Sequence, residues 1–452
     1  MQPSKATATI LTLALAALLP GMASPANAAG RIDAPSPSSA GDWPTFRGDF
    51  GRTGCSASVV PRTAELLWTA RIPREGSIWS SPCVSGGRLY IGGISGNMYC
   101  LDVDTGALVW TFSTGSGQPV YSSPTVAGDR LYFAAYQALY ALPCEDPNGD
   151  GVIAPDEMIW KYHLGPSTGG VNDVNCASPL VVDGTVIIGS VDQYFYGFDS
   201  LNGTLLWHTY TPYRGQHAFS SSPAVGGNRV FAATGDQAGS GRLYCFDRRA
   251  GGILWEFDID DITFSTPAVS GDRVYIANSG DWVGGNNVHR LYCLDADGMA
   301  DGVDDGVPGG QGMGSDLVWF FDLGDYAYSS PALSGDALFI GCSDGRLLCL
   351  SASTGRVIWV YRTPMVFKEP PRGIMGSPAV ADGVVLVGTA DGRLIAAPER
   401  DPDADGVITD SELLWSYPIG GMVTSSPAVA QGRVYIAGAN GRVFCFGEPA
   451  RQ

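Results

Sequence analysis

Apolar residues in this chain come in short runs separated by glycine-rich turns, and the same arrangement returns along most of the sequence. The plainest copy, at residues 80–115, reads SSPCVSGGRLYIGGISGNMYCLDVDTGALVWTFSTG. Its four apolar runs are PCVS, RLYIGG, MYCLD and ALVWTF. Alternation with a period of two residues between tight turns predicts β-strands, so this unit should form a four-stranded antiparallel meander.

Two markers give the number and the phase of the repeats. A Ser-Pro or Thr-Pro pair begins each unit, with prolines at Pro82, Pro124, Pro179, Pro223, Pro267, Pro331, Pro378 and Pro427. A tryptophan stands in each fourth run, at Trp68, Trp110, Trp160, Trp207, Trp255, Trp319, Trp359 and Trp415. The two series are offset, because Trp68 precedes the first pair while the last unit ends at RVFCFGEPARQ without a tryptophan strand.

The early run AELLWTARIP is therefore available to complete the last unit. These patterns predict an all-β fold: an eight-bladed β-propeller of four-stranded antiparallel blades, closed by an N-terminal strand completing the last blade. Residues near Leu67 should then hydrogen-bond beside the segment around Phe444. Each tryptophan is expected to bury roughly 150–250 Å² against the neighbouring blade, which explains its fixed place without a catalytic role.

The predicted organisation is a signal peptide at 1–28, a lead-in segment at 29–60 and the propeller at 61–448. The signal peptide is indicated by Lys5, the short apolar core ILTLALAALLP and the small residues ANA before Ala29. No cysteine directly follows the apolar core. No later stretch approaches the ~20 apolar residues of a spanning helix. We therefore expect an exported protein, periplasmic or secreted, without a lipid anchor or an integral membrane segment.

Charge and cysteine content narrow the setting further. The formal net charge of −18 argues against nucleic acid and anionic membranes as partners, since both need basic patches. Five of the ten cysteines occupy one place in the repeat and are interpreted as small buried fillers: Cys100, Cys245, Cys293, Cys349 and Cys445. The others leave room for one or two disulfides in an exported chain: Cys55, Cys83, Cys144, Cys176 and Cys342.

Two segments, DPNGDGVIAPDE and DPDADGVITDSE, have the ligand order of EF-hand-like calcium loops, and each replaces a short turn between third and fourth strands. The ligands expected for structural Ca²⁺ are Asp146, Asn148, Asp150, the Val152 carbonyl and Glu157 in the first loop, and Asp401, Asp403, Asp405, the Val407 carbonyl and Glu412 in the second. An acidic surface turn is the alternative for both. A looser insertion in the fifth unit offers Asp297, Asp301 and Asp304, without an acidic twelfth residue.

The opposite face of the predicted propeller carries the candidate partner site. The residue three places before each proline should ring the mouth of the central channel: Trp79, Tyr121, Cys176, Ser220, Phe264, Tyr328, Met375 and Thr424. Half of these are aromatic, which suits a flat ring, a sugar or an apolar peptide side chain, although packing between blades is the alternative. With long loops on the same face, the candidate residues are Trp79, Tyr121, Phe264, Tyr328, Arg214, His217 and Trp282.

The repeat resembles that of pyrroloquinoline-quinone (PQQ)-type propellers, through SSP, GRLYIGG, YCLDVDTG, LVWTF and the lead-in WPTFRGDFGRTG. The resemblance covers essentially the whole mature chain and implies the propeller fold. It leaves the function open, because the family includes quinoprotein dehydrogenases and also non-catalytic members such as the lipoprotein that assists outer-membrane protein assembly. In the dehydrogenases the resemblance implies a quinone over the axis, between a tryptophan and a vicinal cysteine disulfide, with a Ca²⁺ bound by Glu, Asn and Asp and another Asp as base.

This sequence departs from the dehydrogenase pattern. It has no adjacent cysteine pair and no C-x-x-C-H motif for a covalent haem, and the catalytic aspartate matches no motif here. Nucleophile-elbow, zinc-helix and phosphate-loop motifs are also absent from the sequence. We therefore predict the non-dehydrogenase branch: an exported, calcium-stabilised binding or scaffold protein for a protein, peptide or glycan. The alternative is a PQQ-dependent dehydrogenase of alcohols or sugars.

Overall fold

The computed structural model describes residues 41–165, 176–211, 221–235, 241–261, 263–279, 288–297, 317–364 and 373–448. All of them belong to one compact unit, Ile32–Gln452. The predicted signal peptide lies outside the described residues. In the described ranges every regular element is a β-strand, and we find there no helix with the length and apolar character that a membrane crossing requires.

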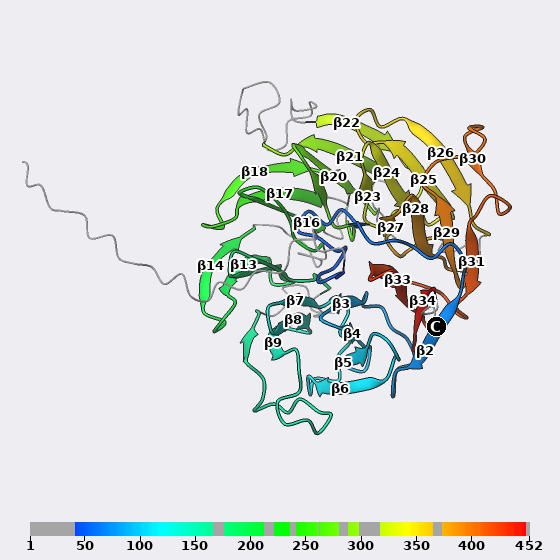
Figure 1. The fold of residues 1–452 in the computed structure, drawn as a ribbon. Helices are drawn as coiled ribbons and strands as arrows, with labels where there is room; N and C mark the ends of the chain where they lie inside the picture. Colours follow the sequence, from blue (N-terminus) through cyan, green and yellow to red (C-terminus); the bar gives the residue numbers. More distant parts are fainter. Residues whose placement is uncertain are drawn as a thin grey trace, which may run out of the picture. The chain divides into compact units, whose positions relative to one another are not determined.

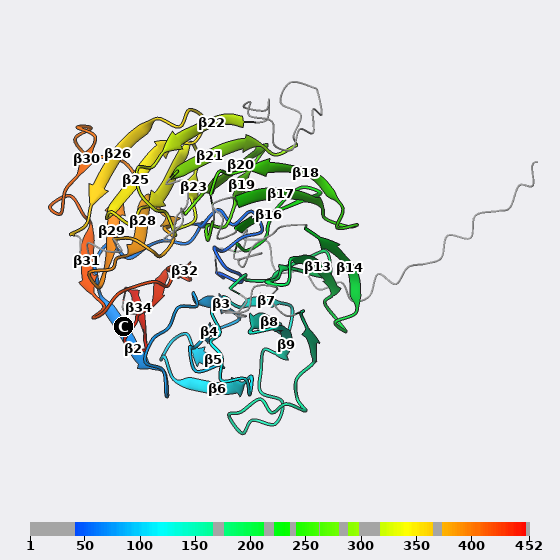
Figure 2. The same ribbon diagram turned by 180° about the vertical axis from the view of Figure 1, so that it is seen from behind.

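Eight antiparallel sheets follow one another around a common axis, and each is one blade of the propeller (Figures 1 and 2). Blade 1 contains β3 (Cys83–Ser85), β4 (Arg88–Gly92), β5 (Asn97–Asp102) and β6 (Leu108–Ser113). Blade 2 contains β7 (Thr125–Ala127), β8 (Arg130–Ala135), β9 (Ala138–Pro143) and β10 (Trp160–His163). Blade 3 contains β11 (Leu180–Val182), β12 (Thr185–Gly189), β13 (Tyr194–Asp199) and β14 (Leu205–Tyr210). Blade 4 contains β15 (Ala224–Gly226), β16 (Arg229–Gly235), β17 (Gly241–Asp247) and β18 (Ile253–Asp258).

The second half of the ring follows the same order, from the short inner strand to the outer one. Blade 5 contains β19 (Ala268–Ser270), β20 (Arg273–Ala277), β21 (Arg290–Asp295) and β22 (Leu317–Asp322). Blade 6 contains β23 (Ala332–Ser334), β24 (Ala337–Gly341), β25 (Arg346–Ser351) and β26 (Val357–Arg362), extended by β30 (Val407–Ile408). Blade 7 contains β27 (Ala379–Ala381), β28 (Val384–Gly388), β29 (Arg393–Pro398) and β31 (Trp415–Pro418), extended by β1 (Cys55–Ser56). Blade 8 contains β32 (Ala428–Ala430), β33 (Arg433–Ala437), β34 (Arg442–Gly447) and β2 (Leu66–Arg71).

The predicted fold class and closure are confirmed by blade 8. Strand β2, from the start of the chain, pairs antiparallel with β34, from its end, with Thr69 opposite Phe444 and Trp68 opposite Cys445. Figure 1 shows the two strands side by side in blue and red. This pairing joins the first and last blades and leaves no open sheet edge at the join.

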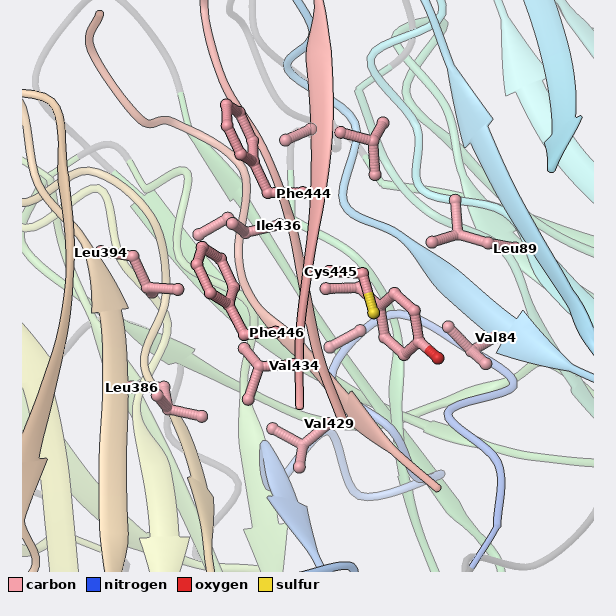
Figure 3. Close-up of a cluster of buried hydrophobic side chains, with 14 of the residues drawn as sticks. Val84, Leu89, Leu386, Leu394, Val429, Val434, Ile436, Phe444, Cys445 and Phe446 are labelled. Carbon is pink, nitrogen blue, oxygen red and sulfur yellow. The ribbon is translucent and has the colours of Figure 1, made fainter. Parts of the chain in front are cut away.

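Apolar side chains from both faces of each blade make the core between the blades. In Figure 3, Phe444 and Phe446 of β34 point to the side of Leu394, whereas Cys445 between them points to the side of Leu89. This alternation follows from the pleat of a strand, and it places apolar groups against both neighbouring blades. Burying one such large side chain contributes about 1.5–3 kcal/mol, so the interfaces between blades hold the ring together.

The repeated tryptophans pack against the neighbouring blade, as predicted. Six indole N–H groups donate to a backbone carbonyl of the next blade or of the segment before β2: Trp68 to Val103, Trp110 to Cys144, Trp160 to Ser200, Trp319 to Ala352, Trp359 to Glu399 and Trp415 to Pro61. The turn that packs against the Trp68 indole ring needs glycine. At Gly106, with φ +70°, an added Cβ would lie 2.6 Å from that indole ring.

All ten cysteines, each within the described ranges, are free thiols. The five at the repeated position are fully buried, as the filler interpretation predicts. Burial raises the pKa of Cys349 and of Cys445 to about 12, so these thiols stay neutral at physiological pH. The one or two disulfides considered for the remaining cysteines are not formed in this structure.

Candidate binding site at the axis of the propeller

The described part of the lead-in segment lies inside the ring of blades, where Figure 1 draws it in dark blue. We call residues 43–56 the axial segment. In six of the eight blades, its backbone bonds to the inner strand at the residue two places after the proline. The bonds run from Trp43 N to Val84 O (2.8 Å), Val84 N to Trp43 O (2.9 Å), Val126 N to Pro44 O (2.8 Å), Val225 N to Phe50 O (2.7 Å), Val269 N to Gly51 O (2.7 Å), Leu333 N to Thr53 O (2.9 Å) and Val380 N to Gly54 O (2.8 Å). The segment therefore circles the axis in blade order and fills the channel at this level.

Two buried arginines occupy the centre of the axial segment. The guanidinium of Arg52 donates to the carbonyls of Pro223 (2.9 Å), Pro179 (3.0 Å) and Ser178 (3.3 Å). That of Arg47 donates to the carbonyls of Pro331 (2.6 Å) and Pro378 (3.1 Å). The same Ser/Thr-Pro pairs that mark the repeat thus supply the acceptors for both cations.

The two arginines are 2% and 0% exposed, and burial lowers the pKa of each to about 9, against the opposing charge of Asp49. Both remain charged at neutral pH. Asp49 accepts hydrogen bonds from the backbone N–H of Thr53 (2.8 Å) and from the Thr53 hydroxyl. Burial nevertheless raises the pKa of Asp49. This end of the channel is therefore closed by a packed and hydrogen-bonded polar cluster.

The serine or threonine before each proline forms a closed ring of hydrogen bonds around the axis. Each hydroxyl oxygen accepts the backbone N–H of the equivalent residue one blade earlier, at 2.9–3.1 Å: Ser123 from Ser81, Ser178 from Ser123, Ser222 from Ser178, Thr266 from Ser222, Ser330 from Thr266, Ser377 from Ser330, Ser426 from Ser377 and Ser81 from Ser426. We call these eight side chains the hydroxyl ring. Because a hydroxyl also carries a proton, each member keeps one donor for another partner.

A cavity of about 640 Å³ opens on the axis above the hydroxyl ring. All eight ring residues line it, and Phe46 of the axial segment lies at its floor. Seven of the residues predicted for the channel mouth line it as well: Trp79, Tyr121, Cys176, Phe264, Tyr328, Met375 and Thr424. Because the axial segment fills the channel below, we call this cavity the axial pit.

The aromatic residues of the axial pit form two pairs on opposite walls. The ring centroids of Trp79 and Tyr121, in front of blades 1 and 2, lie 5.4 Å apart. Those of Phe264 and Tyr328, in front of blades 5 and 6, lie 5.8 Å apart. The structure thus brings four of the seven candidate partner residues to one site. Arg214, His217 and Trp282 lie outside the described residues, as does Ser220.

The axial pit is uncharged as far as it is described, although the chain carries 45 acidic residues. Its polar groups are the hydroxyl ring, Thr424, Tyr121, Tyr328 and the amide of Gln118. Sequence analysis missed the hydroxyl ring, the amide and Phe46. The recurrence of Ser or Thr before every proline was a signal for the ring, whereas nothing in the lead-in pattern places Phe46 on the axis.

The two calcium-like loops lie at the outer strands of the blades. Asp401, Asp403 and Asp405 bring carboxylate oxygens within 4.8 Å of one another. The backbone N–H of Gly406 donates to Asp401 (2.7 Å), and that of Thr409 donates to Glu412 (2.8 Å). The first loop repeats this geometry, with Gly151 donating to Asp146 (2.6 Å) and Ala154 to Glu157 (2.8 Å), beside Asn148 and Asp150. Of the looser third group, Asp297 is described, whereas Asp301 and Asp304 lie outside the described residues.

Each loop attaches to the outer strand of the preceding blade. Val407 in β30 pairs in parallel with Val360 of β26, and Val152 pairs in parallel with Thr111 of β6. In the first loop the bonds to Thr111 use the carbonyl of Gly151 and the N–H of Ile153, so they do not use the Val152 carbonyl. Trp110 and Trp359 on these two outer strands are 0% exposed. The loops therefore join blade 1 to blade 2 and blade 6 to blade 7.

Electrostatics within the second loop follow its hydrogen bonds. The N–H of Gly406 and further backbone donors lower the pKa of Asp401. Asp403 also accepts a backbone N–H, from Asp405, but desolvation and the negative charges of Asp405 and Glu412 outweigh it and raise the Asp403 pKa. The loop thus presents clustered oxygen donors of unequal acidity, a donor set that suits a hard divalent cation.

The described residues of the axial pit do not fit the quinone of the dehydrogenase alternative. PQQ is a planar carboxylated molecule, and no described lining residue is an arginine, a lysine or an acidic ligand for an adjacent Ca²⁺. The cysteines are single free thiols, and the calcium-like loops are attached to outer strands rather than to the axis. We therefore derive no chemical step through a quinone.

Comparison with known proteins agrees with this geometry. The PQQ_2 family profile, described as outer membrane protein assembly factor BamB, matches residues 56–148, 211–300 and 314–405. The chain belongs to this family. The resemblance to PQQ-type propellers is thereby confirmed, and the relatives include members outside the dehydrogenases.

Individual members are distant relatives. Tetrathionate hydrolase of Acidithiobacillus ferrooxidans is 25% identical over 293 residues, 56% of this chain and 53% of that protein. Outer membrane protein assembly factor BamB of Moranella endobia is 22% identical over 303 residues, 64% of this chain and 68% of that protein. The chain thus spans about half the length of the first relative. Among solved structures, a europium-containing methanol dehydrogenase has a TM-score of 0.69 at 12% identity, covering 91% of this chain and 99% of that chain, which shows the fold alone.

Proposed function

We propose that this protein is an exported, non-catalytic scaffold that binds a protein partner on the face where the axial pit opens. Membership of the BamB-described family supports a scaffold role, and the name of that relative suggests a partner from outer-membrane protein assembly. The observation that carries the proposal is the pit itself: paired aromatic side chains stand at the mouth of a blind cavity whose described lining residues are uncharged. Such aromatic groups, rimmed by polar loops, are typical anchors in protein interfaces.

The exposure of the mouth supports this assignment. Trp79 is 43% exposed, so its side chain is accessible to a partner, and its ring centroid lies 5.4 Å from that of Tyr121. Arg214, His217 and Trp282 lie outside the described residues, and they remain candidate partner residues on the sequence pattern alone. A periplasmic or secreted location is supported by the signal-peptide pattern of the first 28 residues and by the name of the BamB relative. Such a location would also provide Ca²⁺-containing surroundings for the two calcium-like loops.

We further propose that both calcium-like loops, Asp146–Glu157 and Asp401–Glu412, which we call the rim loops, bind structural Ca²⁺. The ligand order, the grouped carboxylates of Asp401, Asp403 and Asp405 and the repeated hydrogen-bond pattern support this assignment. A bound cation would neutralise the carboxylates and hold each loop against the outer strand of the preceding blade. Its role would be stability of the ring, away from the partner surface.

The proposal is tested by placing a photo-crosslinking amino acid at Trp79 in cells that make the protein natively. The matched control is Leu206, which is 52% exposed on β14. We expect a discrete protein adduct at position 79 that is absent at position 206 and is lost when Phe264→Ala and Tyr328→Ala are added. Equal adducts at both positions, no adduct at 79, or dye-linked alcohol oxidation after adding PQQ and Ca²⁺ would contradict the scaffold function.

A further inference from the structure

The hydroxyl ring sets the first requirement on any small molecule that enters the axial pit. Each of its eight side chains is at least nine-tenths buried and lines the pit, and each hydroxyl oxygen already accepts one backbone N–H. Each therefore offers an O–H donor and a remaining lone pair toward the axis. A purely apolar ligand would cover these groups without partners, which is unfavourable. The ring instead matches a ligand that both donates and accepts hydrogen bonds around its edge.

The aromatic walls set the second requirement. The pair of Trp79 and Tyr121 and the pair of Phe264 and Tyr328 stand in front of opposite blades, with ring centroids 5.4 and 5.8 Å apart within the pairs. Between these walls the lining residues Cys176 and Met375 are smaller or more flexible. Aromatic faces pack well against flat C–H surfaces, so the walls favour a molecule with apolar ring faces.

The absence of charge from the described lining sets the third requirement. A charged ligand in the pit would lose its hydration without gaining a paired charge, which disfavours its binding. The guanidinium of Arg52, 5.7 Å from the Phe46 ring centroid, belongs to a side chain that is 0% exposed, and its donors are directed at Pro223, Pro179 and Ser178 and at two groups of its own segment. It is therefore not available to an anion in the pit.

From these three requirements we infer that the axial pit is a binding site for a neutral saccharide. Pyranose rings combine C–H faces, which would pack on the aromatic walls, with equatorial hydroxyls, which would bond to the hydroxyl ring and to Gln118. The cavity of about 640 Å³ has room for a short oligosaccharide rather than for a polymer threaded through the ring, because the axial segment closes the channel below. This inference goes beyond the proposed function, which concerns a protein partner.

The test is a titration of the whole exported chain with maltotriose and cellotriose, followed by saturation-transfer NMR and by tryptophan fluorescence. We expect one of these neutral trisaccharides to bind with a Kd of about 1 mM or tighter. Trp79→Ala and Phe264→Ala should each weaken binding about tenfold, because each removes an aromatic wall. Tyr210→Ala is the matched control, since Tyr210 is 51% exposed on β14, and it should leave the Kd unchanged.

Trigalacturonate, a charged trisaccharide, separates the neutral site from general sugar adhesion. Tighter binding of trigalacturonate, no binding of either neutral probe, or binding that the two wall variants do not weaken would overturn the inference. Thermal unfolding of each variant verifies that it is folded, and Tyr328→Phe, which keeps the wall and removes only its hydroxyl, gives a second measurement. If no neutral saccharide binds the wild-type chain while the protein adduct at position 79 is still formed, the saccharide inference fails and the scaffold function stands, so the two failures are distinguishable.

Discussion

The two ends of the propeller channel are built from the same Ser/Thr-Pro repeat but differ in what meets them. At the closed end the proline carbonyls accept hydrogen bonds from Arg47 and Arg52, and the axial segment fills the space. At the open end the preceding hydroxyls line the axial pit beneath aromatic side chains. One dipeptide thus provides acceptors to one end and donors to the other. This difference predicts that the stability of the fold depends on the closed end, whereas ligand binding depends on the open end.

The largest expected effect is at the closed end. Arg52→Met removes a buried cation and leaves several buried carbonyls without donors, so we expect the free energy of unfolding to fall by about 3–5 kcal/mol. Urea denaturation measures it. Arg62→Ala is the control: Arg62 is 52% exposed in its salt bridge with Asp382, and its loss should change stability by at most about 1 kcal/mol. If Arg52→Met and Arg62→Ala have the same free energy of unfolding, the stability of the fold does not depend on the closed end in the way proposed.

Calcium should stabilise the fold through the two rim loops, and it should affect neither end of the channel. If the loops bind Ca²⁺, an excess of 100-fold over Kd stabilises the fold by about 2.7 kcal/mol per site, and a chelator should lower the Tm accordingly. Asp401→Asn with Asp405→Asn should abolish the part of this shift due to the second loop. The calcium effect should fade as pH drops and protonates the ligands. Because the pKa of Asp403 is raised and that of Asp401 is lowered, the effect should begin to weaken when Asp403 protonates and be fully lost only when Asp401 does.

If a chelator does not change the Tm, the calcium proposal is contradicted. The proposed contrast between the two ends of the channel would not be affected by that result. A chelator that abolishes binding at the pit would contradict the separation of rim and axis. Calorimetry of the wild-type protein and of the double variant distinguishes these outcomes.

A smaller effect is expected at the hydroxyl ring, between the two ends. Ser222→Ala removes the acceptor of the Ser178 N–H, so it should destabilise the fold by about 1–3 kcal/mol, toward the lower end if water enters from the pit. Ser222→Thr keeps the oxygen and should be close to neutral, since Thr266 holds this place in blade 5. Thermal unfolding compares the two. Equal loss in both variants would show that size, not the hydrogen bond, matters there.

The smallest stability effect is expected at the open end. Trp79→Ala shortens a side chain that is 43% exposed, so the free energy of unfolding should change by about 0.5 kcal/mol or less. The same variant should weaken saccharide binding about tenfold. A large destabilisation would indicate that the aromatic pair packs the blades together rather than serving a ligand.

Sequence patterns were sufficient for whatever the repeat itself specifies. The offset between proline and tryptophan predicted that β2 completes blade 8, and the place three residues before each proline predicted which side chains stand at the channel mouth. The position of the axial segment was not predictable, because WPTFRGDFGRTG has no repeat partner and reads as a polar lead-in. Besides local groups, Arg47 and Arg52 donate to acceptors 126 to 331 positions away, such as Ser178 and Pro378. No local pattern contains such contacts.

Hydrogen exchange measured by mass spectrometry tests the contrast between the two ends most directly, since one experiment reports both. The account predicts slow exchange at the inner-strand amides of Val269 and Val380, which donate to carbonyls of residues 43–56. It predicts the same for the segment's own amides of Trp43, Gly48 and Gly54, which donate to the carbonyls of Val84, Thr45 and Arg47. Amides around Gly76–Trp79 at the pit mouth should exchange much faster. Rapid exchange throughout residues 43–56 would contradict the account, because the channel would then be open at both ends.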